Sequence, residues 1–286
     1  MIKKIIILTF IVSFIGKIWS QDKIYIWDGT DVRNGMEVTL RPFIAEKGDG
    51  TAVIVCPGGS YFWLDRDCEG EMAARWLQSN GISAFVLHYR TAGFGAYFWH
   101  YRKVFNGNQH PDMLYDAQHA IEYLREHSEE YKIDPNKLGI MGFSAGGHLA
   151  MSTACFADKE ADRPAFVASI YPVVTMNDPY AHQRSRRALL GEKRKNDQTL
   201  RDSLSLEKHI PTNCPPVFIA NCVDDKVVDY HNSLLLDSAL TDKNIQHRYV
   251  QYQTGGHGFG ASEEKGSDEC HQWKKEFINW IQDLKI

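Results

Sequence analysis

Short, continuous apolar runs recur along the chain, and the segments between them carry apolar residues at every third or fourth position. A run without polar alternation is typical of a strand buried on both faces. A spacing of three or four is typical of a helix with one buried face. The apolar runs predict strands over residues 51–56, 82–89, 137–143, 166–174, 217–222 and 248–252.

Helical spacing and end signals predict helices between these strands. The expected ranges are 67–79, from Pro111 to about Tyr131, 145–156, 233–240 and a final helix over 273–284. Residues 24–27 and 37–44 alternate and predict a pair of opening strands. Strands that alternate with helices predict an α/β fold, with a mostly parallel sheet covered by helices on both faces. No internal repeat or linker appears, so residues 21–286 are expected to form one domain, with a polar, basic insertion at about 176–210.

The N-terminus has a different pattern. Lys3 and Lys4 precede an apolar run at 5–16, and Ser20 offers a small residue for cleavage. This order is typical of a secretory signal peptide over residues 1–20, and it predicts a periplasmic or secreted protein. The alternative is a membrane anchor, but the run is shorter than the roughly 20 residues that a span needs.

Composition narrows the possible partners. The 286 residues carry a formal net charge of -4 with a pI near 6.3, which gives no reason to expect a nucleic acid. The six cysteines are even in number, which permits disulfides, but they show no clustered spacing and no CxxC pair. No motif for a metal or a phosphate group appears, so no cofactor is expected.

The pattern Gly-x-Ser-x-Gly at 142–146 is the first sign of chemistry. It is typical of a nucleophile elbow, in which a serine stands on a strained turn between a strand and a helix. The turn forces the serine backbone out of its relaxed regions, so the residues two positions away must lack side chains. Because Ser144 lies between a predicted strand and a predicted helix, it is the expected nucleophile.

An oxyanion hole is expected upstream. Pro57-Gly58-Gly59-Ser60 follows a buried strand, at the place where such folds supply backbone N–H groups to a developing oxyanion. Gly59 and Ser60 are the expected donors, together with Ala145 directly after the serine. The alternative is a plain Gly-Gly turn.

An acid and a histidine are expected downstream. Asp224 and Asp225 follow the strand at 217–222, and Asp225 is the expected acid with Asp224 as a competitor. His257 lies in a glycine-rich loop before the final helix, whereas His148 lies one helical turn past the serine and is expected to pack locally. The order serine, acid, histidine is that of α/β-hydrolases.

These roles define a reaction. His257 would take the proton of Ser144 as the hydroxyl attacks an acyl carbonyl, and Asp225 would hold the imidazole tautomer. The N–H donors would stabilise the tetrahedral intermediate, and water would then release the acyl group.

The chain resembles a family at this point, the secreted bacterial α/β-hydrolase esterases of the acetylxylan and feruloyl type. The matching motifs are Cys56-Pro-Gly-Gly-Ser-Tyr61, Asp116-Ala-Gln118, Ile133-Asp-Pro135, Gly142-Phe-Ser-Ala-Gly-Gly-His148, Tyr171-Pro-Val173, Leu189-Leu-Gly191, Cys214-Pro-Pro216, Asp224-Asp225, Asn232-Ser233 and Gly255-Gly-His-Gly-Phe-Gly260. The resemblance implies an α/β-hydrolase fold and the hydrolysis of esters, in particular acetyl esters, on a polysaccharide or oligosaccharide such as acetylated xylan.

Two features depart from the family pattern. Asp229 stands where the family usually has a proline, and the segment 93–109 is longer and more aromatic than expected. Aromatic residues of the segments 61–63 and 93–101 are the expected substrate-binding residues, because aromatic faces stack on sugar rings. Among them are Tyr61, Trp63 and Trp99. The alternative is that they cover the sheet edge as core.

Other functions remain open. A feruloyl-type esterase would need a larger acyl pocket, which the sequence does not measure. A prolyl-oligopeptidase-like serine peptidase shares the order of the triad, but the chain lacks the propeller domain usual there. A binding module with a dead site is disfavoured by the intact serine, acid and histidine.

Overall fold

The computed structural model describes residues 23–27, 36–99, 107–157, 159 and 162–284. The expected signal peptide at 1–20 lies outside these residues. Among the helices that are described, none combines the length and the apolar character that a membrane crossing requires.

The described residues form one eight-stranded sheet with the order β1-β2-β4-β3-β5-β6-β7-β8. Strands β1 and β2 run antiparallel at one edge, and every pair from β4 to β8 is parallel. The strands are β1 (Ile24–Tyr25), β2 (Thr39–Phe43), β3 (Ala52–Cys56), β4 (Ser83–His88), β5 (Leu138–Phe143), β6 (Val167–Ile170), β7 (Val217–Cys222) and β8 (His247–Tyr252). The mostly parallel sheet is as predicted.

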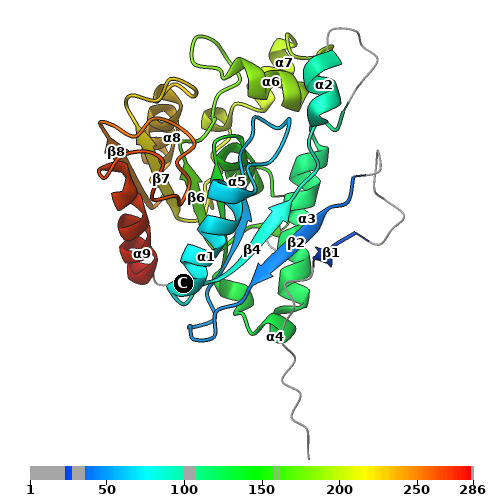
Figure 1. Ribbon diagram of the computed structural model, residues 1–286. Coiled ribbons are helices and arrows are strands. Elements are labelled where there is room, and N and C mark those ends of the chain that lie inside the picture. The colour runs from blue at the N-terminus through cyan, green and yellow to red at the C-terminus, as the bar shows by residue number, and fades with distance from the viewer. Residues whose placement is uncertain (1–22, 28–35, 100–106, 158, 160–161, 285–286) are drawn as a thin grey trace, which may run out of the picture.

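Helices cover both faces of the sheet (Figure 1). Buried residues of α3 (Asp112–Glu126), α5 (Ala145–Cys155) and α8 (His231–Asp242) join one core cluster. Those of α1 (Met72–Ser79) and α9 (Trp273–Asp283) join the other. The remaining helices are α2 (Gly93–Trp99), α4 (Ser128–Tyr131), α6 (Gln183–Leu190) and α7 (Gln198–Ser203).

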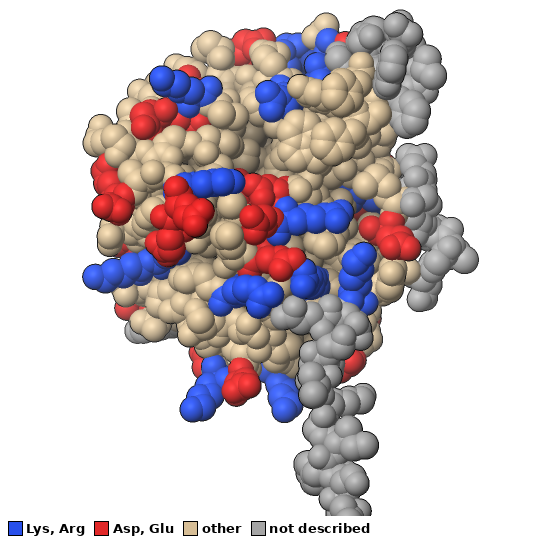
Figure 2. Space-filling view, viewed as in Figure 1, with Lys and Arg blue, Asp and Glu red and all other residues tan. Residues whose placement is uncertain are grey.

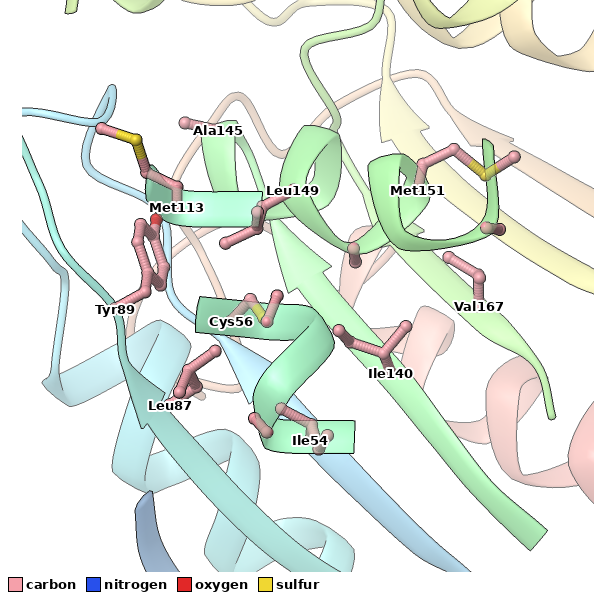
Figure 3. Close-up of a cluster of buried hydrophobic side chains, with 14 of the residues drawn as sticks. Ile54, Cys56, Leu87, Tyr89, Met113, Ile140, Ala145, Leu149, Met151 and Val167 are labelled. Atoms are coloured by element: carbon pink, nitrogen blue, oxygen red, sulfur yellow. The ribbon is translucent and has the colours of Figure 1, made fainter. Parts of the chain in front are cut away.

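Strand β3 shows why the predicted strands lack polar alternation. Ile54 and Cys56 belong to the cluster under α3 and α5, whereas Val53 and Val55 belong to the cluster under α1 and α9. Figure 3 shows the first cluster, with Ile54 and Cys56 between neighbouring strands and helices. Both faces of the strand are therefore buried, and each position needs an apolar side chain.

The observed elements differ from the predicted ones at several places. The first five residues of the helix expected at 67–79 form a π-helix, Asp67–Glu71, ahead of α1. Strand β6 ends at Ile170 because Tyr171 adopts φ 39° and turns the chain toward the serine. The helix expected from Pro111 to Tyr131 divides at His127, whose backbone leaves the helical region (φ -104°, ψ 19°). The segment 93–99, for which no element was predicted, forms α2, and the insertion at 176–210 contains α6 and α7.

A buried ion pair joins the antiparallel edge of the sheet to α3. The Asp116 carboxylate accepts hydrogen bonds from the Arg90 guanidinium at 2.7 Å, the Arg90 N–H at 2.9 Å and the Trp27 indole N–H at 3.0 Å. The side chains of Arg90 and Asp116 are 6% and 0% exposed. Three donors on one buried carboxylate hold the end of β4, the helix and the N-terminal segment in one arrangement.

Asp116→Ala is expected to lower the free energy of unfolding by about 3–5 kcal/mol, because it leaves a buried guanidinium charge without its main partner. Denaturant unfolding followed by circular dichroism measures the change. Glu126→Ala, which removes an exposed acid from the same helix, should stay within about 0.5 kcal/mol of the unmodified protein. Equal effects of the two substitutions would contradict this account.

Candidate active site

Ser144 stands on a strained turn between β5 and α5. Its backbone adopts φ 54° and ψ -120°, a conformation that a residue with a side chain rarely takes. A Cβ at Gly142 would lie 1.9 Å from the carbonyl oxygen of Gly146, and a Cβ at Gly146 would lie 2.1 Å from that of Cys56. The turn therefore closes only because both positions are glycine, which is the steric reason for the Gly-x-Ser-x-Gly pattern.

The structure brings Ser144, His257 and Asp225 together in one chain of hydrogen bonds. The His257 Nε2 lies 2.8 Å from the Ser144 Oγ, and its Nδ1 lies 2.6 Å from the Asp225 Oδ2. The other oxygen of Asp225 accepts the N–H groups of Val227 and Val228 at 2.8 and 3.0 Å. A carboxylate held in this way accepts a hydrogen bond from the Nδ1–H group, which keeps the proton on Nδ1 and leaves Nε2 to accept from the serine hydroxyl.

Asp224, the alternative acid, has a different position. Its carboxylate accepts the N–H of Gly256 at 2.8 Å and that of Gly255 at 3.3 Å. These contacts anchor the backbone of the glycine-rich loop that carries His257. The two neighbouring acids thus have different contacts. Asp225 contacts the imidazole of His257, whereas Asp224 binds the backbone of the loop that carries this histidine.

The loop 57–61 packs directly against the serine. A Cβ at Gly58 would lie 2.9 Å from the Cβ of Ser144, so this close approach requires glycine. Gly59 and Ser60 adopt φ 125° and 56°, which turns the backbone sharply at this point. Within the described part of the chain, no acceptor takes the N–H of Gly59, Ser60 or Ala145. These three donors are available to an oxygen that develops charge beside Ser144.

Glu69 joins the two loops, and its role was not predicted. It is 3% exposed, and its Oε2 accepts the Gly58 N–H at 2.7 Å. Its Oε1 accepts the Tyr171 hydroxyl at 2.9 Å, and that hydroxyl in turn accepts the Gly260 N–H at 2.8 Å. The Tyr171 ring lies 4.6 Å from the His257 ring. One buried carboxyl thus connects the loop 57–61 to the loop that carries His257.

Burial raises the pKa of Glu69 from its usual 4.5 to about 7, against the opposing effect of the nearby His257 charge. No pattern in the sequence marks this residue, because a single acid in a predicted helix is ordinarily a solvated one. Its burial is visible only once the chain is folded.

The expected substrate-binding residues take three different positions. Tyr61 is 1% exposed, and its hydroxyl donates to the His148 Nδ1 at 2.8 Å. The other nitrogen of that histidine donates to the Leu204 carbonyl at 3.0 Å, and burial lowers the His148 pKa to about 4. The Tyr61 ring therefore belongs to the core. His148 was expected to interact locally, but its main partners, Tyr61 and Leu204, come from distant parts of the sequence.

Trp63 is half-buried at the surface of the site. It stacks on Phe94 with ring centroids 5.4 Å apart and meets the edge of Tyr97 at the same distance. Trp99 belongs to α2, but its side chain is not among those described. The aromatic cluster thus contains both core residues and residues that face outward, such as Phe94, which is 62% exposed.

All six cysteines are free thiols in the structure. Across the part of the chain with described positions, no three histidine, cysteine, aspartate or glutamate side chains form a group that could hold a metal ion. The arrangement around Ser144 consists of a hydroxyl, a base, an acid that orients the base and free N–H donors. Such a set can carry out nucleophilic attack on an acyl carbonyl.

Comparisons with known proteins agree on one family. The BD-FAE family model matches residues 45–240. An acetylxylan esterase of Xylanibacter ruminicola is 30% identical over 247 residues, which are 85% of this chain and 46% of that protein. An endo-1,4-beta-xylanase B of Butyrivibrio fibrisolvens is 34% identical over 223 residues, 74% of this chain and 33% of that protein. The chain thus spans less than half the length of either curated relative.

Solved structures extend the comparison to nearly the whole chain. An acetyl ester-xyloside bifunctional hydrolase from Caldicellulosiruptor lactoaceticus is 32% identical, with a TM-score of 0.79, and the match covers 92% of this chain and 96% of that one. An alpha/beta hydrolase from a deep-sea metagenome library has a TM-score of 0.65 at 22% identity over 92% of this chain and 98% of that one, which supports the fold alone. The predicted α/β-hydrolase fold is confirmed, and the chain belongs to the BD-FAE family.

Proposed function

We propose that this protein is a serine carboxylesterase that removes acetyl groups from acetylated xylan or from oligosaccharides derived from it. The observation that carries the proposal is the hydrogen-bonded chain Ser144–His257–Asp225 at a strained elbow. The names of the relatives, an acetylxylan esterase and an acetyl ester-xyloside hydrolase, support the substrate class. Neither a feruloyl ester nor a peptide is favoured by a feature of the site.

The mechanism follows from the geometry. His257 accepts the Ser144 proton through Nε2 as the hydroxyl oxygen attacks the acetyl carbon, and Asp225 stabilises the imidazolium that results. The N–H groups of Gly59, Ser60 and Ala145 bind the oxyanion of the tetrahedral intermediate. His257 then protonates the departing sugar hydroxyl, and a water molecule activated by the same histidine releases acetate.

Export fits the proposed substrate. A polymer such as xylan stays outside a bacterial cell, so its esterase acts in the periplasm or the medium. The basic and apolar pattern at residues 1–20 is the signal that would carry the chain there. After cleavage, the expected product is the domain at 21–286, with no nucleic acid or membrane as a partner.

Ser144→Ala is expected to reduce kcat/KM on p-nitrophenyl acetate and on acetylated xylan by at least about 10³-fold, because the attacking oxygen is absent. Release of acetate from the polymer and of p-nitrophenol from the model ester measures the change. Circular dichroism checks that the variant is folded. Activity equal to that of the unmodified protein would overturn the proposal.

Asp225→Ala and Asp224→Ala are expected to lower kcat by different factors, which distinguishes the roles of the two acids. The first removes the group that fixes the histidine tautomer and should lower kcat by about 10³–10⁴-fold. The second removes only the anchor of the loop backbone and should lower kcat far less, together with the melting temperature. Equal losses of kcat in both variants would count against the assignment of Asp225 as the triad acid.

Glu69 is expected to make stability fall as the pH rises from about 4.5 to about 7. Its pKa in the folded protein is about 7 against 4.5 normally, so between these values the folded state holds a proton that the unfolded state has lost. The full effect is about 3 kcal/mol. The free energy of unfolding, measured against pH for the unmodified protein and Glu69→Gln, should show this loss only in the former.

The exposed Glu264 supplies the matched control. The curve for Glu264→Gln should run parallel to that of the unmodified protein. A parallel curve for Glu69→Gln as well would show that Glu69 does not titrate in this range.

A further inference from the structure

A basic hollow lies between α2 and the insertion. Its volume is about 780 Å³. The lining residues used below are Tyr97, Phe98, Arg184, Arg186, Arg187 and Lys195. Figure 2 shows Lys and Arg side chains at the top of the molecule, where Figure 1 places α2, α6 and α7.

The hollow borders the candidate active site. His182, directly before α6, lies close enough to His257 for that charge to contribute to lowering its pKa, although burial is the larger cause. On the other side, Trp63 contacts the oxyanion loop through the hydrogen bond of its N–H to the Gly59 carbonyl at 3.2 Å. The Arg184 guanidinium lies over the Trp63 ring, 5.9 Å from its centroid. A polysaccharide bound with an acetyl group at Ser144 would extend past these residues.

The four cations of the hollow fall into two kinds. Arg186 donates to the Met176 carbonyl at 3.0 Å and to Asp178 at 3.3 Å, and Lys195 pairs with Glu192. Their charges are already compensated by the protein.

Arg184 and Arg187 have no such partners. Within the described residues, neither guanidinium has a carboxylate or a hydrogen-bond acceptor, and the buried Nε of Arg187 is unsatisfied. Arg187 lies 5.0 Å from the Phe62 ring centroid and 5.6 Å from that of Tyr97. Stacking on an aromatic face orients a guanidinium and leaves its N–H edge free for a planar anion.

We propose that this hollow is a subsite for a sugar that carries a carboxylate, a uronic acid attached to the same polysaccharide as the acetyl ester. The inference rests on the proposed function and adds a charged substituent to its substrate. A carboxylate matches the planar fork of an arginine with two parallel hydrogen bonds. The rings of Tyr97 and Phe98, the latter 61% exposed, offer the apolar surface on which a sugar ring packs.

A solvated basic face is the competing interpretation of the same residues. It would hold arginines that extend into water with every N–H hydrated. Here the Nε of Arg187 has less than 1 Å² of exposed area and no hydrogen-bond partner, so this side chain is not the fully hydrated one that a solvated face would hold. The guanidinium groups without protein acceptors, at a hollow that adjoins Trp63 and the loop 57–61, therefore favour a binding site.

The test compares two acetylated xylo-oligosaccharides of equal size, one with a glucuronic acid substituent and one with the same substituent reduced to the neutral sugar. The quantity measured is the ratio of kcat/KM for the acidic substrate to that for the neutral one. The unmodified protein should give a ratio above one that falls as salt is added. Arg184→Gln and Arg187→Gln should each lower this ratio about fivefold to tenfold, the effect of losing one charged hydrogen bond.

Lys193→Ala is the matched control, because it removes a positive charge from an exposed position of the same insertion that does not line the hollow. It should leave the ratio unchanged. Arg187 packs on aromatic rings and its loss can disturb α2, whereas Arg184 is exposed, so the Arg184 variant decides if the other fails to fold.

The possible outcomes distinguish a failure of the proposed subsite from a failure of the proposed function. A ratio of one in the unmodified protein, or a ratio that neither arginine variant changes, would overturn the subsite and leave the esterase intact. If the protein hydrolysed neither substrate, the proposed function itself would fail. Calorimetric binding of both oligosaccharides to Ser144→Ala, with and without Arg184→Gln, then tests the subsite alone, and equal affinities would overturn it.

Discussion

The strained backbone at Ser144 is the constraint on which the rest of the site depends. A residue with φ 54° and ψ -120° keeps this conformation only if its surroundings hold it, and here β5 enters the turn from the middle of the sheet while α5 leaves it fully buried. The contacts at Gly142 and Gly146 leave no space for side chains, so the turn, the strand and the helix fix one another. The serine hydroxyl thus lies between the end of β5 and the start of α5. This position is at the carboxyl ends of the parallel strands, where the loops of the site meet.

Two acids, the buried Glu69 and the exposed Asp224, hold these loops in position. Glu69 binds the loop 57–61 and, through the Tyr171 hydroxyl, the loop that carries His257. Asp224 binds the histidine loop a second time, through Gly255 and Gly256. Glycine-rich loops approach a substrate closely but are mobile by themselves, so carboxylates that accept their N–H groups supply the rigidity that a pre-organised site needs. The acids of this site therefore act mostly on the backbone, and Asp225 alone of the three contacts the histidine ring.

The aromatic residues near the site form one cluster that contains both buried and exposed side chains. Tyr61 and Phe62 are buried and build the floor, whereas Phe94 and Phe98 are exposed at the rim. Arg184 lies over the Trp63 ring and Arg187 over the rings of Phe62 and Tyr97, so the basic insertion and the aromatic cluster pack together. The charged subsite that we propose rests on these two arginines, and the neutral part of a polysaccharide would pack on the aromatic faces.

The sequence by itself determined the sheet, the elbow and the order of serine, acid and histidine, because each depends on a local property: continuous apolar runs, glycines around a strained serine and the position of loops after strands. It also limited the candidates for the acid to two neighbouring residues, Asp224 and Asp225. Only the tertiary structure shows how the two differ in their contacts. Asp225 lies against the His257 ring, whereas Asp224 accepts the Gly256 N–H of the same loop, and this loop is more than thirty residues away in the sequence. Glu69 and α2 were likewise not predicted from the sequence, because burial of a charge and the pairing of distant side chains depend on contacts that no local pattern encodes.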